Sequence, residues 1–476
     1  GEEAVTIDAA LAGARDILAE ELCLSADLRA RLRKVFRKEA MLSTALRSER
    51  KGDAGRHKSL VGYTAAVNQV QPLKFLAVRR AEKDRILVTT IEPPDESIMP
   101  LLHKSASTEE HPHAGFLRAA IEDGYRRILK PLFQAELRTE LKRRADAAAM
   151  DTFERNLRHR LLGPVGGNRR TLGLRPDVMQ GHRWSAVDEE GLPTGSGTLP
   201  HEGTAGREAC VTELAEVVTT YDVDVIAVGT GGGRAEAVSL AEEAVKKQDR
   251  DIDVTVVSDG GTHTLEAQGK LEVKGRPEIP AECRGAYSLA RRFQDPLAEL
   301  VSIEPKALAL GPHLHEVHQG RLRQLLDETV ASCVAHVGVD PNTAGVDLLA
   351  RVPGFDRASA TAFHLWQTEH GALLHKAALA AVPGIGTNVA EQAVGFLQLK
   401  GAEDPRDRTQ LHPEQYGVVD KMAERAGCDV ATLFADATMR QKVRLPELES
   451  EGIRMPLLKY VLYQVTAGHL DDRPRF

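Results

Sequence analysis

Two turns rich in proline and glycine are the parts of this sequence whose residue types and spacing could do chemistry. Residues 382–386 read Val-Pro-Gly-Ile-Gly between two stretches with helical spacing, and residues 352–355 read Val-Pro-Gly-Phe thirty residues earlier. Turns of this kind join the two helices of a helix-hairpin-helix element, where glycine lets the backbone turn sharply and approach a ligand closely. The free N–H groups at the start of the second helix can then face a phosphate. The predicted chemistry is phosphate binding without reading of bases.

The second turn carries the stronger prediction, and a plain interhelical turn is the alternative for both. The first turn is expected to be a weaker clamp, because Asp356 follows it where a glycine would serve better. Residues 341–400 contain four basic and four acidic side chains, so binding here should be weak taken alone. The candidate nucleic-acid-binding residues are Gly384, Ile385, Gly386, Thr387 and Asn388 in the second turn, Gly354 and Phe355 in the first, and Arg351, Arg357 and Lys376 as a source of charge.

Three further patterns have simpler explanations. Residues 229–234 (Gly-Thr-Gly-Gly-Gly-Arg) follow a buried strand but match neither a Walker A sequence nor a complete dinucleotide fingerprint, which favours a structural turn over a nucleotide loop. His313, His315 and His318 have metal-ligand spacing without a further ligand, which favours a polar helix start. Residues 115–170 hold 13 basic and 7 acidic side chains, which favours a solvated helix face over a phosphate-facing stripe.

The elements that position these residues follow from hydrophobic spacing. Residues 6–48 are predicted to be helical, and residues 74–78 and 85–89 to be two strands of a small β-hairpin. Residues 115–162 return to a helical pattern. Strands alternate with helices from residue 169 to about 300, which predicts an α/β domain, and the chain is almost entirely helical after Gln294. The expected fold class is mainly α with one α/β domain.

Composition excludes several classes of protein. No apolar run approaches the length of about 18 residues that a membrane-spanning helix needs. The five cysteines are widely spaced and form no C-x-x-C pair, so no metal or disulfide framework is expected and a reducing cytoplasm is favoured. The net charge of −7 requires any nucleic-acid partner to bind at a local patch. No cofactor, membrane or small-molecule substrate is expected.

Several segments resemble the Tex family of bacterial transcription accessory proteins. They are residues 7–18, 284–300, 338–344, 391–397 and 412–414, which follow the family's order along the chain. The resemblance implies a helical region with a small β-hairpin unit at 1–168, an RNase H-like domain of the YqgF type at 169–300, tandem helix-hairpin-helix motifs at 301–400 and a helical segment at 401–476. It also implies that an N-terminal helical region and a C-terminal OB-fold RNA-binding domain are absent, as in an excised core.

The resemblance also directs attention to the carboxylates of an RNase H-like nuclease, which gather around two metal ions. Arg175 stands where the Tex pattern has an aspartate, and Asp177 lies beyond a proline. Asp259 and Asp295 remain acidic at plausible positions, but two carboxylates are too few. We therefore expect a catalytically degenerate domain.

The expected function is that of a non-enzymatic nucleic-acid-binding factor in transcription, with RNA or single-stranded DNA favoured through the resemblance and the transcription machinery as a further partner. A metal-dependent nuclease using Asp177, Asp259 and Asp295 is one alternative. A protein-interaction scaffold that has lost nucleic-acid binding is the other.

Overall fold

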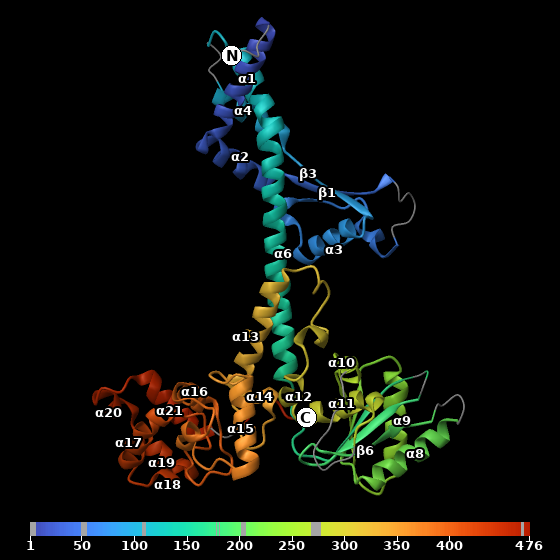
Figure 1. Cartoon of the computed structure of the whole chain (residues 1–476), viewed down its shortest axis with the longest axis vertical. Coiled ribbons are helices and arrows are strands. Elements are labelled where there is room, and N and C mark those ends of the chain that lie inside the picture. Colours follow the sequence, from blue (N-terminus) through green and yellow to red (C-terminus); the bar gives the residue numbers. More distant parts are fainter. Residues whose placement is uncertain are drawn as a thin grey trace. The chain divides into compact units, whose positions relative to one another are not determined.

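The computed structural model describes residues 6–48, 55–106, 111–177, 179, 181–200, 206–267, 278–467 and 471–476. The chain divides into two compact units, one formed by Gly1–Phe153 with Gly311–Leu322 and the other by Glu154–Leu310 with Arg323–Phe476. The boundary between them falls within the long helix α6 (Lys130–Leu161) (Figure 1). None of the described helices is both long and apolar enough to cross a membrane.

The first unit consists mainly of helices. Helix α2 is capped at its N-terminus, since the Ser25 hydroxyl accepts a hydrogen bond from the Leu28 N–H at 3.3 Å. Leu32 and Phe36 are buried along the same face of α2, as their helical spacing predicts. The elements are α1 (Ile7–Leu24), α2 (Ala26–Glu39), α3 (Pro72–Lys83), α4 (Asp95–Ala106) and α5 (Ala114–Gly124), with 3-10 turns η2 (Gly55–Leu60) and η3 (Val67–Gln69) and the π-helical turn η4 (Tyr125–Leu129).

The small sheet of this unit differs from the predicted β-hairpin. Its antiparallel strands are β1 (Met41–Leu46), β2 (Thr64–Ala66) and β3 (Leu87–Glu92), in the order β2-β1-β3. Residues 74–78 were predicted to be a strand but lie in α3, and residues 41–46 were predicted to be helical but form β1. The errors have one cause, because a short apolar run fits a buried helix and a buried strand equally well. Pro72, at the first position of α3, was the signal for a helix start.

The helical prediction for residues 115–162 is correct. Helix α5, the turn η4 and α6 follow one another almost without a break. The Lys130 N–H bonds to the Tyr125 carbonyl, five residues back, just before Pro131. Since proline has no N–H and crowds the preceding turn, a wider π turn at this point accommodates it within a helical stretch.

The second unit begins with the predicted α/β domain. Within its described residues the strands are β4 (Thr171–Arg175), β5 (Arg183–Val187), β6 (Pro193–Thr198), β7 (Val225–Gly229) and β8 (Asp253–Val257), in the order β6-β5-β4-β7-β8. The first three strands are antiparallel, and β7 and β8 run parallel to β4. The helices are α8 (Arg207–Thr220), α9 (Arg234–Val245), α10 (Thr262–Glu266) and α11 (Arg284–Gln294) (Figure 1).

The two faces of this sheet have separate cores. Leu172 and Leu174 on β4 pack in one cluster with residues of α8 and α9. On the other face α11 lies directly on β4, so that a Cβ added at Gly173 would come within 1.9 Å of the Ala286 carbonyl oxygen. Only glycine allows this close approach.

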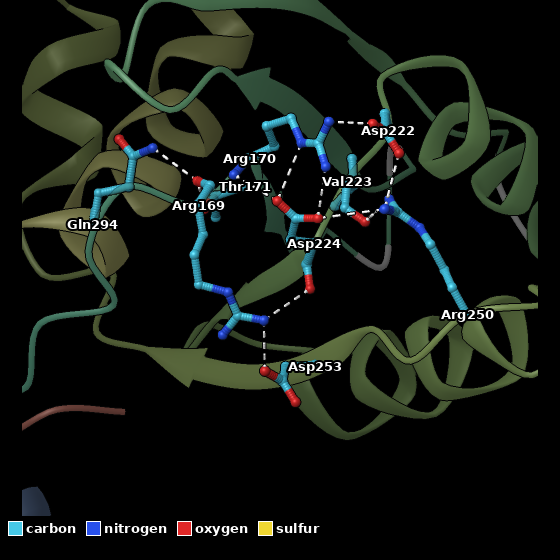
Figure 2. A network of polar contacts seen from close by, with 9 residues as sticks. All are labelled: Arg169, Arg170, Thr171, Asp222, Val223, Asp224, Arg250, Asp253 and Gln294. Atoms are coloured by element: carbon cyan, nitrogen blue, oxygen red, sulfur yellow. Dashed lines mark hydrogen bonds and ion pairs between the residues drawn. The ribbon is translucent and has the colours of Figure 1, made fainter.

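A network of ion pairs holds the starts of β4 and β7 together (Figure 2). Asp224 accepts hydrogen bonds from the Arg170 backbone N–H at 3.1 Å and from Arg170 Nε and Nη2 at 3.1 and 3.0 Å. Arg250 reaches the same carboxylate at 3.3 Å, and Arg169 contacts Asp253 on β8 at 2.7 Å. These bonds lower the pKa of Asp224 against the opposing effect of its burial, which keeps the carboxylate charged. All of these partners are internal, so the network has a structural role.

The rest of the second unit is helical, as predicted. Short helices joined by glycine- and proline-containing turns carry the two candidate turns of the sequence. The elements are η5 (Ala281–Cys283), α12 (Pro296–Leu300), η6 (Pro305–Leu308), α13 (Gln319–Val337), α14 (Val346–Leu349), α15 (Arg357–His370), η7 (Lys376–Ala381), α16 (Thr387–Ala393), η8 (Val394–Phe396), η9 (Pro413–Gln415), α17 (Tyr416–Ala426), α18 (Val430–Ala435), α19 (Ala437–Lys442), α20 (Leu445–Ser450) and α21 (Met455–Ala467).

Candidate nucleic-acid interface

The two proline-glycine turns have the same local structure. In the first, the Phe355 N–H donates to the Val352 carbonyl at 3.0 Å, and in the second the Ile385 N–H donates to the Val382 carbonyl at 3.0 Å. The central glycines have positive φ angles, +97° at Gly354 and +86° at Gly384. Each turn leads into a helix, α15 after the first and α16 after the second. The two hairpins are therefore structural repeats.

Each turn packs against the helix of the other hairpin. A Cβ added at Gly354 would lie 2.9 Å from Gln392 Cβ on α16, and one added at Gly384 would lie 2.8 Å from Ala362 Cβ on α15. The contact at Gly354 also includes backbone, since the Ala393 nitrogen would be 3.0 Å away. These glycines are required both by their φ angles and by this reciprocal packing. The two turns consequently hold each other in place.

The repeats differ at the residue that begins the helix. In the first hairpin this is Asp356, whose carboxylate accepts a hydrogen bond from the Ser359 N–H at 2.8 Å while the Ser359 hydroxyl donates to it at 2.7 Å. Those bonds, with that of the Ser359 backbone the largest, hold the pKa of Asp356 below its usual value. The start of α15 is thus occupied by a negative charge of the protein itself.

In the second hairpin the same position is Gly386, which brings no side chain to the start of α16. Gly386, Thr387 and Asn388 are exposed, and among the described residues no atom comes within 4 Å of the place a Gly386 Cβ would take. The N–H groups at this turn are therefore open to a ligand on the outside of the protein. The second turn is open where the first is closed.

Three of the predicted binding residues are not placed to contact a ligand. Phe355 and Ile385 are buried, at 8% and 5% exposure, and their N–H groups close the two turns internally. Lys376 is 1% exposed and its ammonium donates to the carbonyls of Thr409 and Leu411 at 2.6 and 2.8 Å. The expectation that these residues supply donors or charge to a phosphate was wrong, because burial and internal bonds take them out of reach.

The two predicted arginines lie at the surface in ion pairs. Arg351 contacts Asp327 at 3.0 Å and Arg357 contacts Asp347 at 2.9 Å. All four side chains line a cavity of about 540 Å³ that also includes Lys306. Exposed pairs of this kind contribute little to stability and exchange readily for other partners. Arg351 and Arg357 remain available to a polyanion, but only in competition with these carboxylates.

The nuclease-like positions of the α/β domain lie in separate local contacts. Arg175 forms an ion pair with Glu266, and Asp177 with Arg183 at 2.6 Å. Asp259 accepts a hydrogen bond from the Thr230 hydroxyl at 2.6 Å. Asp295 caps α12 through the N–H groups of residues 297 and 298 and pairs with Arg473 at 2.8 Å. Within the described part of the chain, no three carboxylate, histidine or cysteine side chains come together as a metal site would require.

The residues of the three remaining sequence patterns make contacts within the protein. The loop at 229–233 lies beside Asp259, since a Cβ at Gly231 would be 2.8 Å from Asp259 Oδ2. His313 and its neighbours precede α13, and His313 lies 3.9 Å from Glu316. The basic residues of 115–170 are largely paired, as in Arg127–Asp123, Lys142–Asp146 and Arg158–Glu154.

Comparison with protein families identifies four parts of the chain. A Tex central region-like model matches residues 2–153, and a model of the Tex protein YqgF-like domain matches residues 169–294. A helix-hairpin-helix motif matches residues 334–398, and an HHH domain matches residues 404–473. The chain is 30% identical over 486 residues to the protein YdcI of Bacillus subtilis, covering 100% of this chain and 67% of that protein.

The chain belongs to the Tex family.

Two other relatives agree with this assignment. The chain is 30% identical to Protein tex of Bordetella pertussis and 31% identical to Transcriptional accessory protein Tex of Neisseria gonorrhoeae, each over 98% of its own length. It spans 61% and 62% of the length of these two proteins. The predicted combination of a YqgF-like domain with helix-hairpin-helix motifs in a mainly helical chain is thus confirmed.

One domain match of this Tex-family chain was not predicted from the sequence. Residues 404–473, expected only as a C-terminal helical segment, match an HHH domain. Its helices α17 to α21 form a core of their own around Met422, Leu433 and Leu458. The available signals were the turn glycines Gly427 and Gly452, with φ angles of +72° and +91°, but no proline-glycine pair accompanies them.

Proposed function

We propose that this Tex-family chain is a non-enzymatic transcription accessory factor that binds single-stranded nucleic acid, RNA or DNA, through the second hairpin turn. The observation that carries the proposal is the open helix start at Gly386, in a hairpin that matches a known helix-hairpin-helix motif. The transcription role is supported by the name of the Neisseria relative, a transcriptional accessory protein.

In this proposal the exposed backbone at Gly386, Thr387 and Asn388 donates hydrogen bonds to phosphate oxygens. A glycine here lets the strand approach the main chain without meeting a side chain. The hydroxyl of Thr387 and the amide of Asn388 provide further donors of neutral type. Such contacts position a strand without reading its bases, so little sequence preference is expected.

A non-enzymatic role is supported by the separation of the carboxylates in the α/β domain. Arg175 and its partner Glu266 occupy the end of β4, where a nuclease of this fold would place a metal-binding aspartate. Asp295 is held by Arg473 and by the start of α12. Neither arrangement gathers negative charge for two metal ions.

The test is fluorescence-anisotropy titration of single-stranded RNA, single-stranded DNA and duplex DNA across a salt series, with Gly386→Glu as the variant. We expect the glutamate to weaken single-strand binding on the order of tenfold at low salt, because it places a negative charge where the phosphate would lie. Gly386 has φ −72°, so the substitution does not strain the backbone.

The matched control is Gly345→Glu. Gly345 begins α14 with φ −72° and ψ 162°, is exposed and has open space around it, so it undergoes the same charge change at the same kind of position. Equal weakening by the two variants would mean that only overall charge matters. Unchanged binding in Gly386→Glu would remove the second turn from the interface, and absence of binding by the parent chain would favour a protein-interaction scaffold.

A further inference from the structure

A second cavity lies beside β8, the edge strand of the α/β domain, far in sequence from the hairpin turns. Its volume is about 660 Å³, and it is bounded by the last turns of α6, the end of β8, α11 and α12. Among the side chains that line it the ionisable ones are Arg160, Arg292 and His159, and none is acidic. The ionisable side chains of the cavity wall are therefore all basic.

The guanidinium of Arg160 enters this cavity from α6. Its Nη1 donates to the hydroxyl of Ser258, and its Nη2 donates to the Ala309 carbonyl at 3.2 Å. Burial lowers the pKa of Arg160, which the more distant Asp259 partly offsets. Within the described residues Arg160 has no carboxylate in ion-pair contact, so its charge is held by neutral groups alone.

Arg292, on α11, is 3% exposed and also bonds to Ser258. Its Nε donates to the Ser288 hydroxyl at 3.1 Å, and its Nη1 donates to the carbonyls of Ser258 and Gly260 at 2.6 and 2.8 Å. The remaining nitrogen, Nη2, is buried and has no hydrogen-bond partner among the residues that the structure describes. A buried charged nitrogen without a partner costs free energy that a bound anion would recover.

The nearest carboxylates are engaged elsewhere. Asp259 accepts the hydroxyl of Thr230, and Glu299 lies 4.0 Å from Arg291. Burial lowers the pKa of Arg292 to about 10, and the positive charge of Arg160 contributes to the same shift. The charges of Glu299 and Asp259 act in the opposite direction on the pKa of Arg292, but among the described residues neither carboxylate forms an ion pair with Arg160 or Arg292.

Most of the remaining wall is apolar, with the polar side chains of Asn156 and Thr230 as exceptions. Val256, Pro296, Leu300 and Leu308 line it, and Val256 at the exposed edge of the sheet is 42% exposed. A cavity of this volume is within the usual range for small ligands, and its combination of apolar wall and converging charged groups is typical of such sites.

We propose that this cavity binds the phosphoryl group of a ligand of about mononucleotide size, with Arg160 and Arg292 contacting the phosphate oxygens and the apolar wall contacting the base. The ligand is either a free nucleotide or the phosphorylated end of a strand, which present the same chemistry. This site lies in a different domain from the hairpin turns, so it does not depend on the proposed function. It differs from the expectation, made from the sequence, that the chain has no cofactor or small-molecule substrate.

The test is isothermal titration calorimetry of the whole chain with AMP, with adenosine, and with a short oligonucleotide carrying or lacking a 5′-phosphate. We expect AMP or the phosphorylated oligonucleotide to bind and adenosine and the unphosphorylated oligonucleotide not to bind at this site. Arg160→Gln should weaken binding on the order of tenfold or more, because a charge-assisted hydrogen bond is lost. Arg158→Gln, in the same turn of α6 but outside the cavity lining, should leave binding unchanged.

A second variant guards against misfolding of Arg160→Gln. Val256→Glu keeps both arginines and puts a carboxylate at the exposed edge of the cavity, so it should weaken binding while circular dichroism remains unchanged. Binding by AMP would identify a free nucleotide as a ligand, and binding only by the phosphorylated oligonucleotide would identify a strand end. No binding by either probe, or binding that both variants leave unchanged, would overturn the proposal. Neither result would bear on Gly386→Glu, whose effect tests the hairpin turn separately.

Discussion

Lys376 shows at the residue scale why side-chain type alone is a poor guide to a binding surface. It lies close to the second turn in the sequence, yet its ammonium is buried against the carbonyls of residues 409 and 411. The carboxylate of Asp407, also buried, provides the nearest opposite charge. The lysine therefore connects the helix-hairpin-helix motif to the chain segment that follows it.

Burial lowers the pKa of Lys376 to about 7, with Asp407 acting in the opposite direction. The unfolded chain would hold this proton up to a pH of about 10. Between these two pH values the unfolded state binds more protons, so the free energy of unfolding should rise with pH. We predict that urea unfolding measured from pH 7.5 to 9.5 shows this rise and that Lys376→Met abolishes it. The exposed Lys459→Met is the control, and a slope retained in Lys376→Met would contradict the prediction.

Asp356 carries a prediction of its own under the proposed function. Asparagine at this position keeps a helix cap but removes the charge. We expect Asp356→Asn to tighten single-strand binding roughly two- to fivefold at low salt, because one negative charge near the phosphates is removed. Glu369→Gln makes the same charge change near the other end of α15. An equal gain in both variants, measured by anisotropy, would show only a general effect of net charge.

At the scale of elements, the reciprocal packing of the two turns means that alanine should affect stability differently at Gly384 and at Gly386. Gly384→Ala forces a side chain into φ +86° and against Ala362, whereas Gly386→Ala meets neither obstacle. We predict that Gly384→Ala lowers the free energy of unfolding by about 1–3 kcal/mol and that Gly386→Ala changes it by less than about 1 kcal/mol. Chemical denaturation of both variants checks this. A similar loss in both would mean that the turns do not support each other.

The elements also show which parts of the fold could be predicted from the sequence. Both hairpin turns and the α/β alternation were predicted, because proline, glycine and hydrophobic spacing act locally. Residues 74–78 were misassigned, because five apolar and basic residues do not distinguish helix from strand. The burial of Lys376 and the convergence of Arg160 with Arg292 were not predictable, because each depends on partners distant in the sequence.

At the scale of the whole second unit, the last described residues return to the α/β domain. The Val165 N–H donates to the Pro474 carbonyl at 2.8 Å, and the Phe476 ring lies 4.9 Å from that of Phe293. Arg473 anchors this segment with a side chain only 4% exposed, bonded to both Asp295 and Asp471. Asp295, a candidate nuclease carboxylate in the sequence, thus forms an ion pair that holds the last described residues in place.

We predict that Arg473→Met destabilises this arrangement by about 1–3 kcal/mol, less than a fully buried ion pair would cost because Asp295 is 39% exposed. Hydrogen exchange of the Val165 amide should accelerate in this variant and not in the exposed Arg475→Met control. Unchanged protection of Val165 would mean that Arg473 does not hold the segment.

The capping of one hairpin by Asp356 has a consequence for the kinetics of binding under the proposed function. Two open turns joined rigidly would form a bivalent surface, in which the second contact benefits from a high effective concentration and both must release before the strand leaves. With the first turn closed by the protein's own carboxylate, the surface is univalent, so a bound strand departs in one step and its residence time is short. Such a chain is suited to brief, repeated contacts along a moving strand rather than to long-lived capture.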